Sequence, residues 1–145
     1  MNIEFREIDD DNFDECVALA VREDQPFVAS NLKSLAQAFV NRAAVPRAVY
    51  VEGAMVGFLM YLVDRGGGEL YLWRFMMDKG QQGKGYGTAA LGLLERIARA
   101  EPGVVRMRLS TSPDNANGIK VYTKFGFMDT GILDDGEEVF VKELR

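Results

Sequence analysis

The segment that decides the fold is Met77-Asp78-Lys79-Gly80-Gln81-Gln82-Gly83-Lys84-Gly85-Tyr86-Gly87-Thr88. An apolar stretch precedes it and an apolar helical stripe follows it, so a strand runs through a glycine-rich turn into a helix. Glycines let a backbone approach a ligand closely, and the first amides of a helix converge where its dipole favours negative charge. The segment therefore predicts a site for a pyrophosphate at the start of the helix.

Two common phosphate loops do not fit this segment. A P-loop requires a glycine five residues before its Gly-Lys pair, and Asp78 stands there. A dinucleotide fingerprint begun at Gly83 would need its last glycine at Thr88, and one begun at Gly85 would need it at Ala90. Both loops are excluded, and the pattern that is present is Gln-x-x-Gly-x-Gly.

A second motif follows, Asn115-Ala-Asn-Gly-Ile-Lys-Val-Tyr-Thr-Lys-Phe-Gly-Phe127. It resembles the Asn-x-x-Ala-x-x-Leu-Tyr-x-x-x-Gly-Phe signature of the GNAT superfamily of N-acetyltransferases, and Gln82–Gly87 resembles the coenzyme A loop of the same superfamily. Gly118 and Val121 depart from the usual alanine and leucine. The motifs stand in the expected order, and the resemblance covers essentially the whole chain.

The resemblance implies acetyl-coenzyme A as donor and assigns roles to the matching residues. Tyr122 matches the general acid that protonates the departing thiolate. Backbone groups of Phe75 and Met77 would polarise the thioester carbonyl and hold the pantetheine arm, while Asn115 could serve the cofactor or cap a helix. The residues expected at the cofactor are Phe75, Met77, Gln82, Gly83, Lys84, Gly85, Tyr86, Gly87, Thr88 and Asn115.

The general base is left open by the sequence. Many diamine acetyltransferases carry a glutamate on the strand before the loop, and counting back from Gln82 places Trp73 at that position. A base could act through water from Glu69, Glu23 or Asp24, or solvent could suffice.

Composition excludes several other chemistries. The 145 residues include one cysteine, Cys16, and no histidine. Ser-His-Asp and Cys-His catalysis and the usual zinc sites are therefore excluded, and no metal is expected. A lone cysteine suits a reducing compartment, no apolar run approaches the roughly 20 residues of a membrane span, and the first residues do not read as a signal peptide. A cytoplasmic location is expected, with no membrane partner.

The charge pattern bears on the ligands. The formal net charge of −5 argues against a nucleic-acid partner. Residues 1–24 hold nine acids against two arginines, whereas residues 70–128 hold nine Lys or Arg against four acids. A basic middle suits a polyanionic cofactor and acidic flanks suit a cationic substrate, although any single charge is more simply a solvated one.

The apolar periodicity predicts one domain over residues 1–145, with the element order β-α-α-β-β-β-α-β-α-β-β. The first helix follows Asp10–Asn12 and is broken by Pro26, and the second carries Leu32, Leu35, Ala36 and Phe39 and ends before Pro46. The strands are expected at residues 2–8, 48–51, 55–63, 70–77, 104–109, 127–132 and 138–141, and the last helix at 115–125. The expected fold is α/β, a mixed but mostly antiparallel sheet of about seven strands with helices on both faces, as in the GNAT superfamily.

A closer resemblance concerns the acceptor. Gln25–Ala36, Trp73–Asp78 and the Asp134–Gly136 turn are similar to bacterial spermine/spermidine acetyltransferases. The implied function is acetyl transfer to a primary amine, a polyamine such as spermine or spermidine, by direct attack on the thioester. The residues expected to bind this amine are the acids Glu23, Asp24 and Glu69.

Two other functions remain open at this point. One is acetylation of protein N-termini or lysines, which the acidic N-terminal segment would also suit. The other is a non-catalytic acyl-coenzyme A sensor, against which the presence of Tyr122 argues. The resemblance also suggests a homodimer.

Overall fold

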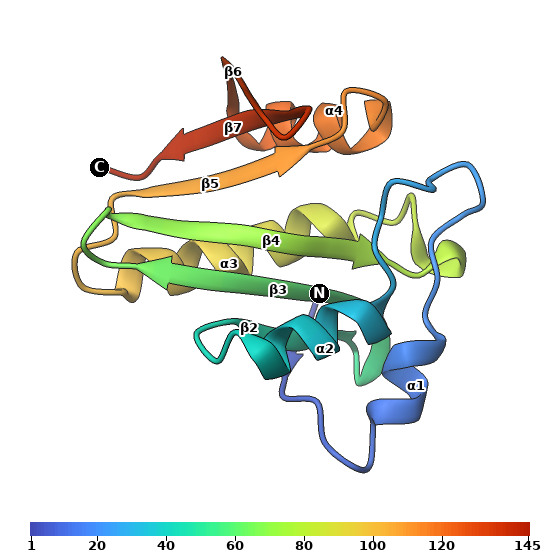
Figure 1. Cartoon of the computed structure of the whole chain (residues 1–145). Coiled ribbons are helices and arrows are strands. Elements are labelled where there is room, and N and C mark those ends of the chain that lie inside the picture. Colours follow the sequence, from blue (N-terminus) through green and yellow to red (C-terminus); the bar gives the residue numbers. More distant parts are fainter.

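All seven strands join one sheet in the order β1-β2-β3-β4-β5-β7-β6 in the computed structural model, which describes residues 1–145 (Figure 1). The strands are β1 (Ile3–Arg6), β2 (Val45–Val51), β3 (Ala54–Asp64), β4 (Glu69–Met77), β5 (Arg106–Thr111), β6 (Met128–Asp134) and β7 (Glu137–Glu143). The helices are α1 (Phe13–Ala18), α2 (Asn31–Val40), the short 3-10 helix η1 (Lys79–Gln81), α3 (Tyr86–Ala100) and α4 (Ala116–Phe125). Only β4 and β5 are parallel, so the predicted mixed, mostly antiparallel sheet is confirmed.

The helices cover both faces of the sheet, as predicted. On one face, the apolar stripe of α3, including Leu91 and Leu94, packs without exposure against strand residues such as Leu70 and Met107. On the other face, α1 and α2 cover a smaller cluster that includes the fully buried Cys16. Burial of these two apolar clusters is the main favourable term for folding. No helix is both long and apolar enough to cross a membrane.

The two parallel strands diverge before they end. β5 pairs with β4 only along Glu69–Leu72, although β4 continues to Met77 and stays paired with β3 on its other side. Figure 1 shows β4 and β5 separating towards their carboxyl ends. Backbone N–H and C=O groups need partners, and the edge of Trp73–Met77 that faces β5 has no neighbouring strand. The sheet is therefore open at this point.

The first two helices differ from the sequence expectation. α1 ends at Ala18, well before Pro26. In α2, Leu32 and Phe39 are 58% and 70% exposed, while Asn31 and Ser34 are buried. Asn31 turns inwards because its amide donates a hydrogen bond to the carbonyl of Cys16 at 2.8 Å, which ties α2 to the end of α1. The helix stripe predicted from apolar spacing alone was therefore wrong for these positions.

Pro46 also differs from its predicted role, since it lies inside β2 instead of stopping α2, which ends at Val40. A proline cannot donate to a sheet ladder. β1 pairs only with residues Ala48–Val51 of β2, so Pro46 lies beyond the end of β1 and has a strand neighbour on the β3 side alone. The remaining predicted elements are present, with ends shifted by at most three residues.

Candidate active site

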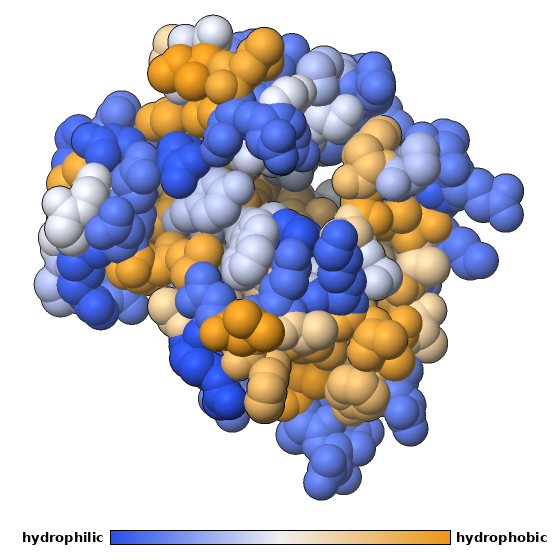
Figure 2. All heavy atoms as spheres, viewed as in Figure 1, coloured by the Kyte–Doolittle hydropathy of each residue, from blue (hydrophilic) through white to orange (hydrophobic).

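Two cavities lie at the carboxyl ends of β4 and β5, where the sheet opens. We name the first, of about 450 Å³, the loop cavity, because the segment 81–88 lines it. We name the second, of about 430 Å³, the strand cavity, because residues of β4, β5 and β7 line it. Figure 2 shows the surface hollowed beside these strand ends. The two cavities share the lining residues Phe27, Val28, Phe75, Asn115 and Tyr122, so they meet at the opening of the sheet.

The loop cavity is built for an anion. Gly83 and Gly85 have φ of +76° and +81°, a left-handed conformation that favours glycine, and Gly85 is the N-cap of α3. The first amides of α3 have no partner within the helix, so they are available to a ligand. Two cations, Arg22 and Lys120, line this cavity, and no Asp or Glu does. The residues present therefore fit a pyrophosphate group.

Nine of the ten residues predicted at the cofactor line the loop cavity, namely Phe75, Met77, Gln82, Gly83, Gly85, Tyr86, Gly87, Thr88 and Asn115. Lys84 is not among them, since it is exposed and its Nζ donates to Gln81 Oε1 at 3.2 Å. The structure thus brings the predicted set together, while the contact of each residue with a cofactor stays a prediction.

Two of these side chains already have partners within the chain. Asn115 Oδ1 accepts from the amide of Gly118 at 3.1 Å, so Asn115 caps α4. Gln82 Nε2 donates to Gln25 Oε1 at 2.9 Å and to the carbonyl of Met77 at 3.1 Å. The Gln25–Gln82 contact ties the segment between α1 and α2 to the glycine-rich loop, and that segment lines both cavities.

Tyr122 stands where the two cavities meet. Its ring lies 6.3 Å from that of Phe75 and 6.1 Å from that of Phe127, and the residue is only 7% exposed. Burial raises the pKa of the Tyr122 phenol above its usual value, because a phenolate would lose its hydration. The phenol therefore stays protonated at neutral pH and can act as a proton or hydrogen-bond donor.

The strand cavity has a different character, since charged and aromatic residues are prominent in its lining. Its charged residues are Lys33, Arg74 and Glu137, and Tyr71 and Trp73 add aromatic surface. Arg74 Nη2 donates to Gln37 Oε1 at 2.9 Å, while its buried Nε has no partner. Burial lowers the pKa of Arg74, although a guanidinium remains charged at any working pH.

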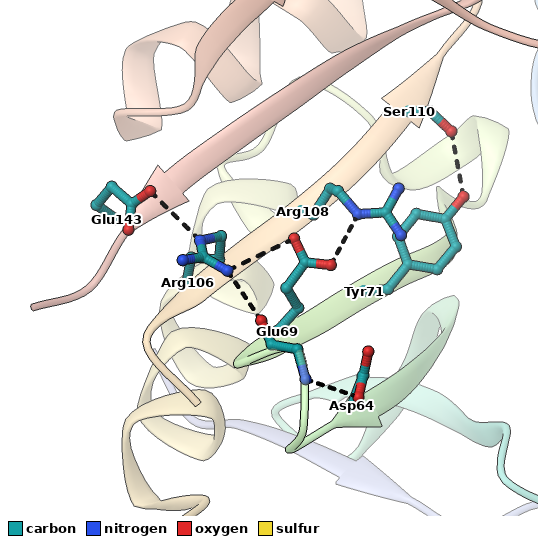
Figure 3. Close-up of polar contacts among 8 residues, drawn as sticks. Asp64, Glu69, Tyr71, Arg106, Arg108, Ser110 and Glu143 are labelled. Atoms are coloured by element: carbon teal, nitrogen blue, oxygen red, sulfur yellow. Dashed lines mark hydrogen bonds and ion pairs between the residues drawn. The ribbon is translucent and has the colours of Figure 1, made fainter. Parts of the chain in front are cut away.

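The three acids predicted to bind the amine are not in either cavity. Glu69 lies at the opposite end of β4, where its carboxylate pairs with Arg108 at 3.1 Å and with Arg106 at 4.0 Å (Figure 3). Glu23 and Asp24 are exposed in the segment before α2, and Asp24 pairs with Arg22 at 3.4 Å. Direct contact between Glu69 and an amine at the site is not supported, because the charge of Glu69 is already balanced at a distance from the cavities.

Several lining residues were missed by the sequence analysis. Lys120 lies three residues after Asn117 on α4, so helical spacing places both on one face of the helix, and both line the loop cavity. That signal was present in the sequence. Glu137 and Arg74 carried no comparable signal, because the pairing of β7 with β5 and the packing of α2 bring them to the cavity.

Other reactive groups are absent from the site. Cys16 lies in α1 and is fully buried, and burial raises the pKa of its thiol to about 11, so little thiolate exists at neutral pH. The structure contains no group of three or more His, Cys, Asp or Glu side chains that could hold a metal ion. The chemistry of the site therefore depends on Tyr122, the open edge of β4 and the charged residues of the two cavities.

A glycine-rich anion site that adjoins a second cavity gives this fold room for two ligands side by side, as a group-transfer enzyme requires. The family described as "Acetyltransferase (GNAT) family" matches residues 4–127. The Spermine/spermidine N(1)-acetyltransferase of Bacillus subtilis is 35% identical, over 99% of this chain and 100% of that one. The chain belongs to the GNAT acetyltransferase family and is an acetyl-coenzyme A-dependent amine N-acetyltransferase, as the sequence predicted.

Solved structures agree with the fold. The PaiA N-acetyltransferase from Thermoplasma acidophilum, in complex with coenzyme A, superposes with a TM-score of 0.74 at 17% identity, covering 99% of each chain. An aminoglycoside acetyltransferase in complex with coenzyme A has a TM-score of 0.80 at 18% identity, covering 98% of this chain and 95% of that one. These likenesses confirm the predicted fold class.

Proposed function

We propose that this enzyme acetylates a primary amine of a polyamine such as spermine or spermidine, with acetyl-coenzyme A in the loop cavity and the amine in the strand cavity. The observation that carries the proposal is the meeting of the two cavities at Phe75 and Tyr122. A donor and an acceptor that enter separately would face each other there. The polyamine is favoured because the Bacillus subtilis relative, similar over its whole length, is named for spermine and spermidine.

The donor side follows from the residues of the loop cavity. Acetyl-coenzyme A supplies an activated acetyl thioester on a chain that carries a pyrophosphate. Gly83, Gly85 and the first amides of α3 would hold that pyrophosphate, with Arg22 and Lys120 as counter-charges. The open edge of β4 around Phe75 would offer backbone donors to the carbonyl oxygen, where negative charge grows during transfer.

Tyr122 holds a proton close to the place where the sulfur departs. Its Oη would donate this proton towards the sulfur, which matches the general-acid role that the sequence predicts. Burial raises the pKa of the Tyr122 phenol, so the proton is present at neutral pH and can pass to the sulfur as the bond between carbon and sulfur breaks.

The attacking amine must be neutral, and the strand cavity favours that form. Arg74 and Lys33 both line it, and neighbouring positive charge lowers the pKa of an ammonium group. This lowering of the amine pKa would partly take the place of a general base, because Trp73 stands at the β4 position where many diamine acetyltransferases carry a glutamate. Glu23 and Asp24, which are exposed in the segment between α1 and α2, would act on the amine only through water or through the field of their charges.

An amine panel at fixed acetyl-coenzyme A tests the proposal. We expect kcat/KM for spermine or spermidine to exceed that for a simple monoamine by at least about tenfold, roughly 1.4 kcal/mol. A clear preference for peptides would instead identify a protein acetyltransferase of the same family. Binding of acetyl-coenzyme A without release of coenzyme A with any amine would identify a sensor.

Two further expectations belong to this proposal. We expect a homodimer, because Met128, Ile132 and Leu133 are 60–73% exposed on the edge strand β6. Exposed apolar edges favour pairing with another chain, and light scattering coupled to size-exclusion chromatography would give the mass. The cytoplasm remains the expected location, because the lone cysteine, Cys16, has no partner in the chain for a disulfide.

A further inference from the structure

The strand cavity contains one carboxylate, and it does not come from the cofactor strand. Trp73 occupies the β4 position where related diamine enzymes carry an acid, and both Trp73 and Glu137 line this cavity. Glu137 begins β7, two strands away from β4 in the sheet. The one acid that lines this cavity thus comes from a different element.

Glu137 is a half-buried acid that has no ion pair. Glu69, Glu95 and Glu101 are similarly half-buried, and each pairs with at least one arginine or lysine at 4.0 Å or less. No lysine or arginine lies within that distance of Glu137. A half-buried carboxylate that the chain leaves unpaired is available to a cation from outside.

Two hydroxyl groups hold Glu137 in place. Ser110 Oγ donates to Glu137 Oε1 at 3.2 Å, and Tyr71 Oη lies 3.1 Å from the same Ser110 Oγ. A serine hydroxyl has one hydrogen, and since Ser110 gives it to the carboxylate, Tyr71 must be the donor to Ser110. Both donors are thus directed towards the carboxylate, and its second oxygen, Oε2, has no partner in the chain.

A row of paired charges lies beside this arrangement, on β4, β5 and β7. The guanidinium of Arg108 lies 4.3 Å from the centre of the Tyr71 ring and also pairs with Glu69 (Figure 3). Arg106 pairs with Glu69 and Glu143 further along. Every acid in this row except Glu137 is neutralised, so Glu137 is the one negative charge that the row presents to the cavity.

We propose that Glu137 binds a charged ammonium group of the acceptor and thereby selects amines with a second nitrogen. This inference rests on the proposed function. The aromatic surfaces of Tyr71 and Trp73 in the same cavity also favour an ammonium group. Arg74 and Lys33 disfavour a second charged nitrogen in the cavity, so the nitrogen that reacts is the neutral one.

The test is Glu137→Gln, which keeps the shape and removes the charge. We expect kcat/KM for spermidine to fall by about 10- to 100-fold, mainly through KM, because a charge-assisted hydrogen bond is lost. The kcat/KM for butylamine, which has no second nitrogen, should stay within about twofold, since this charge has nothing to bind. Ser110→Ala should change spermidine KM in the same direction but less, and Glu137→Asp should restore part of the loss.

Glu138→Gln is the matched control. Glu138 is the next residue of β7, is also half-buried and unpaired, and lines neither cavity. Its variant should behave as wild type with spermidine. If Glu137→Gln loses activity equally on spermidine and butylamine, or loses none on either, the proposed role of Glu137 is wrong. The proposed function still stands in that case, provided that the wild-type enzyme prefers spermidine. If wild-type enzyme has no preference for spermidine, both proposals fail.

Discussion

The loop cavity and the strand cavity are next to each other but differ in the groups that they offer to a ligand. The loop cavity relies on backbone, with glycines in left-handed conformations and the first amides of α3. The strand cavity relies on side chains, among them Trp73, Arg74 and Glu137. A backbone site demands glycine at fixed spacing, whereas a side-chain site can be assembled from any elements that the fold brings together. The comparison predicts that substitutions should separate donor binding from acceptor choice.

The largest effect is expected from Gly85→Glu, which alters the loop cavity and leaves the strand cavity unchanged. A side chain at φ of +81° is strained, and its charge would face the pyrophosphate. We expect acetyl-coenzyme A affinity to fall by on the order of 10²-fold or more, by calorimetry, because like charges in contact cost several kcal/mol. Gly92→Glu is the control, since Gly92 lies within α3, lines neither cavity and has open space around it. Unchanged affinity in Gly85→Glu would remove the pyrophosphate from this loop.

Tyr122→Phe changes a residue that lines both cavities, and it should alter the shape of neither. It keeps the ring contacts with Phe75 and Phe127 and removes only the hydroxyl. We expect kcat to fall on the order of 10²-fold with both KM values nearly constant, measured by steady-state kinetics. Because burial raises the pKa of Tyr122, the wild-type enzyme should show no loss of kcat from phenol ionisation between pH 8 and about 10. A variant with wild-type kcat would show that Tyr122 serves packing only.

Gln25→Ala tests whether the two cavities are independent. Gln25 hydrogen-bonds Gln82 in the loop, and its neighbours Phe27 and Val28 line both cavities. Loss of one such hydrogen bond is worth about 0.5–1.5 kcal/mol, so we expect KM for acetyl-coenzyme A and for the amine to rise together by about two- to tenfold. A rise in only one of the two constants would mean that the segment before α2 does not couple them.

The smallest effect is expected from Glu23→Gln combined with Asp24→Asn. Both side chains are exposed and outside the cavities, so they influence a polyamine only through their field. We expect KM for spermidine to rise by no more than about fivefold at low salt, with the difference vanishing above about 0.1 M salt, where the Debye length is near 10 Å. Acetyl-coenzyme A affinity should not change. A large effect that survives high salt would indicate direct contact with the amine.

The same contrast explains what the sequence could predict. The glycine-rich wall of the loop cavity was predicted, because Gln82–Gly87 encodes its geometry locally, whereas Arg22 and Lys120 of the same cavity were not. The acceptor side was not, because Glu69 is close to the loop in sequence yet eight residues of extended β4 place it about 26 Å from Met77. Glu137 reaches the cavity only through the pairing of β7 with β5. Likewise, Leu32 and Phe39 fit an inward stripe by spacing, and only the contact between Asn31 and Cys16 shows that α2 is rotated.

The divergence of β4 from β5 also has an evolutionary consequence. Only five residues belong to both cavities, so most positions that line the strand cavity do not line the loop cavity. Mutations along β7 or in the wall formed by Trp73 and Arg74 can alter which amine enters while acetyl-coenzyme A is still bound and presented. A gene duplicate of this enzyme could thus acquire a new acceptor through a few single-residue steps, without passing through an inactive intermediate.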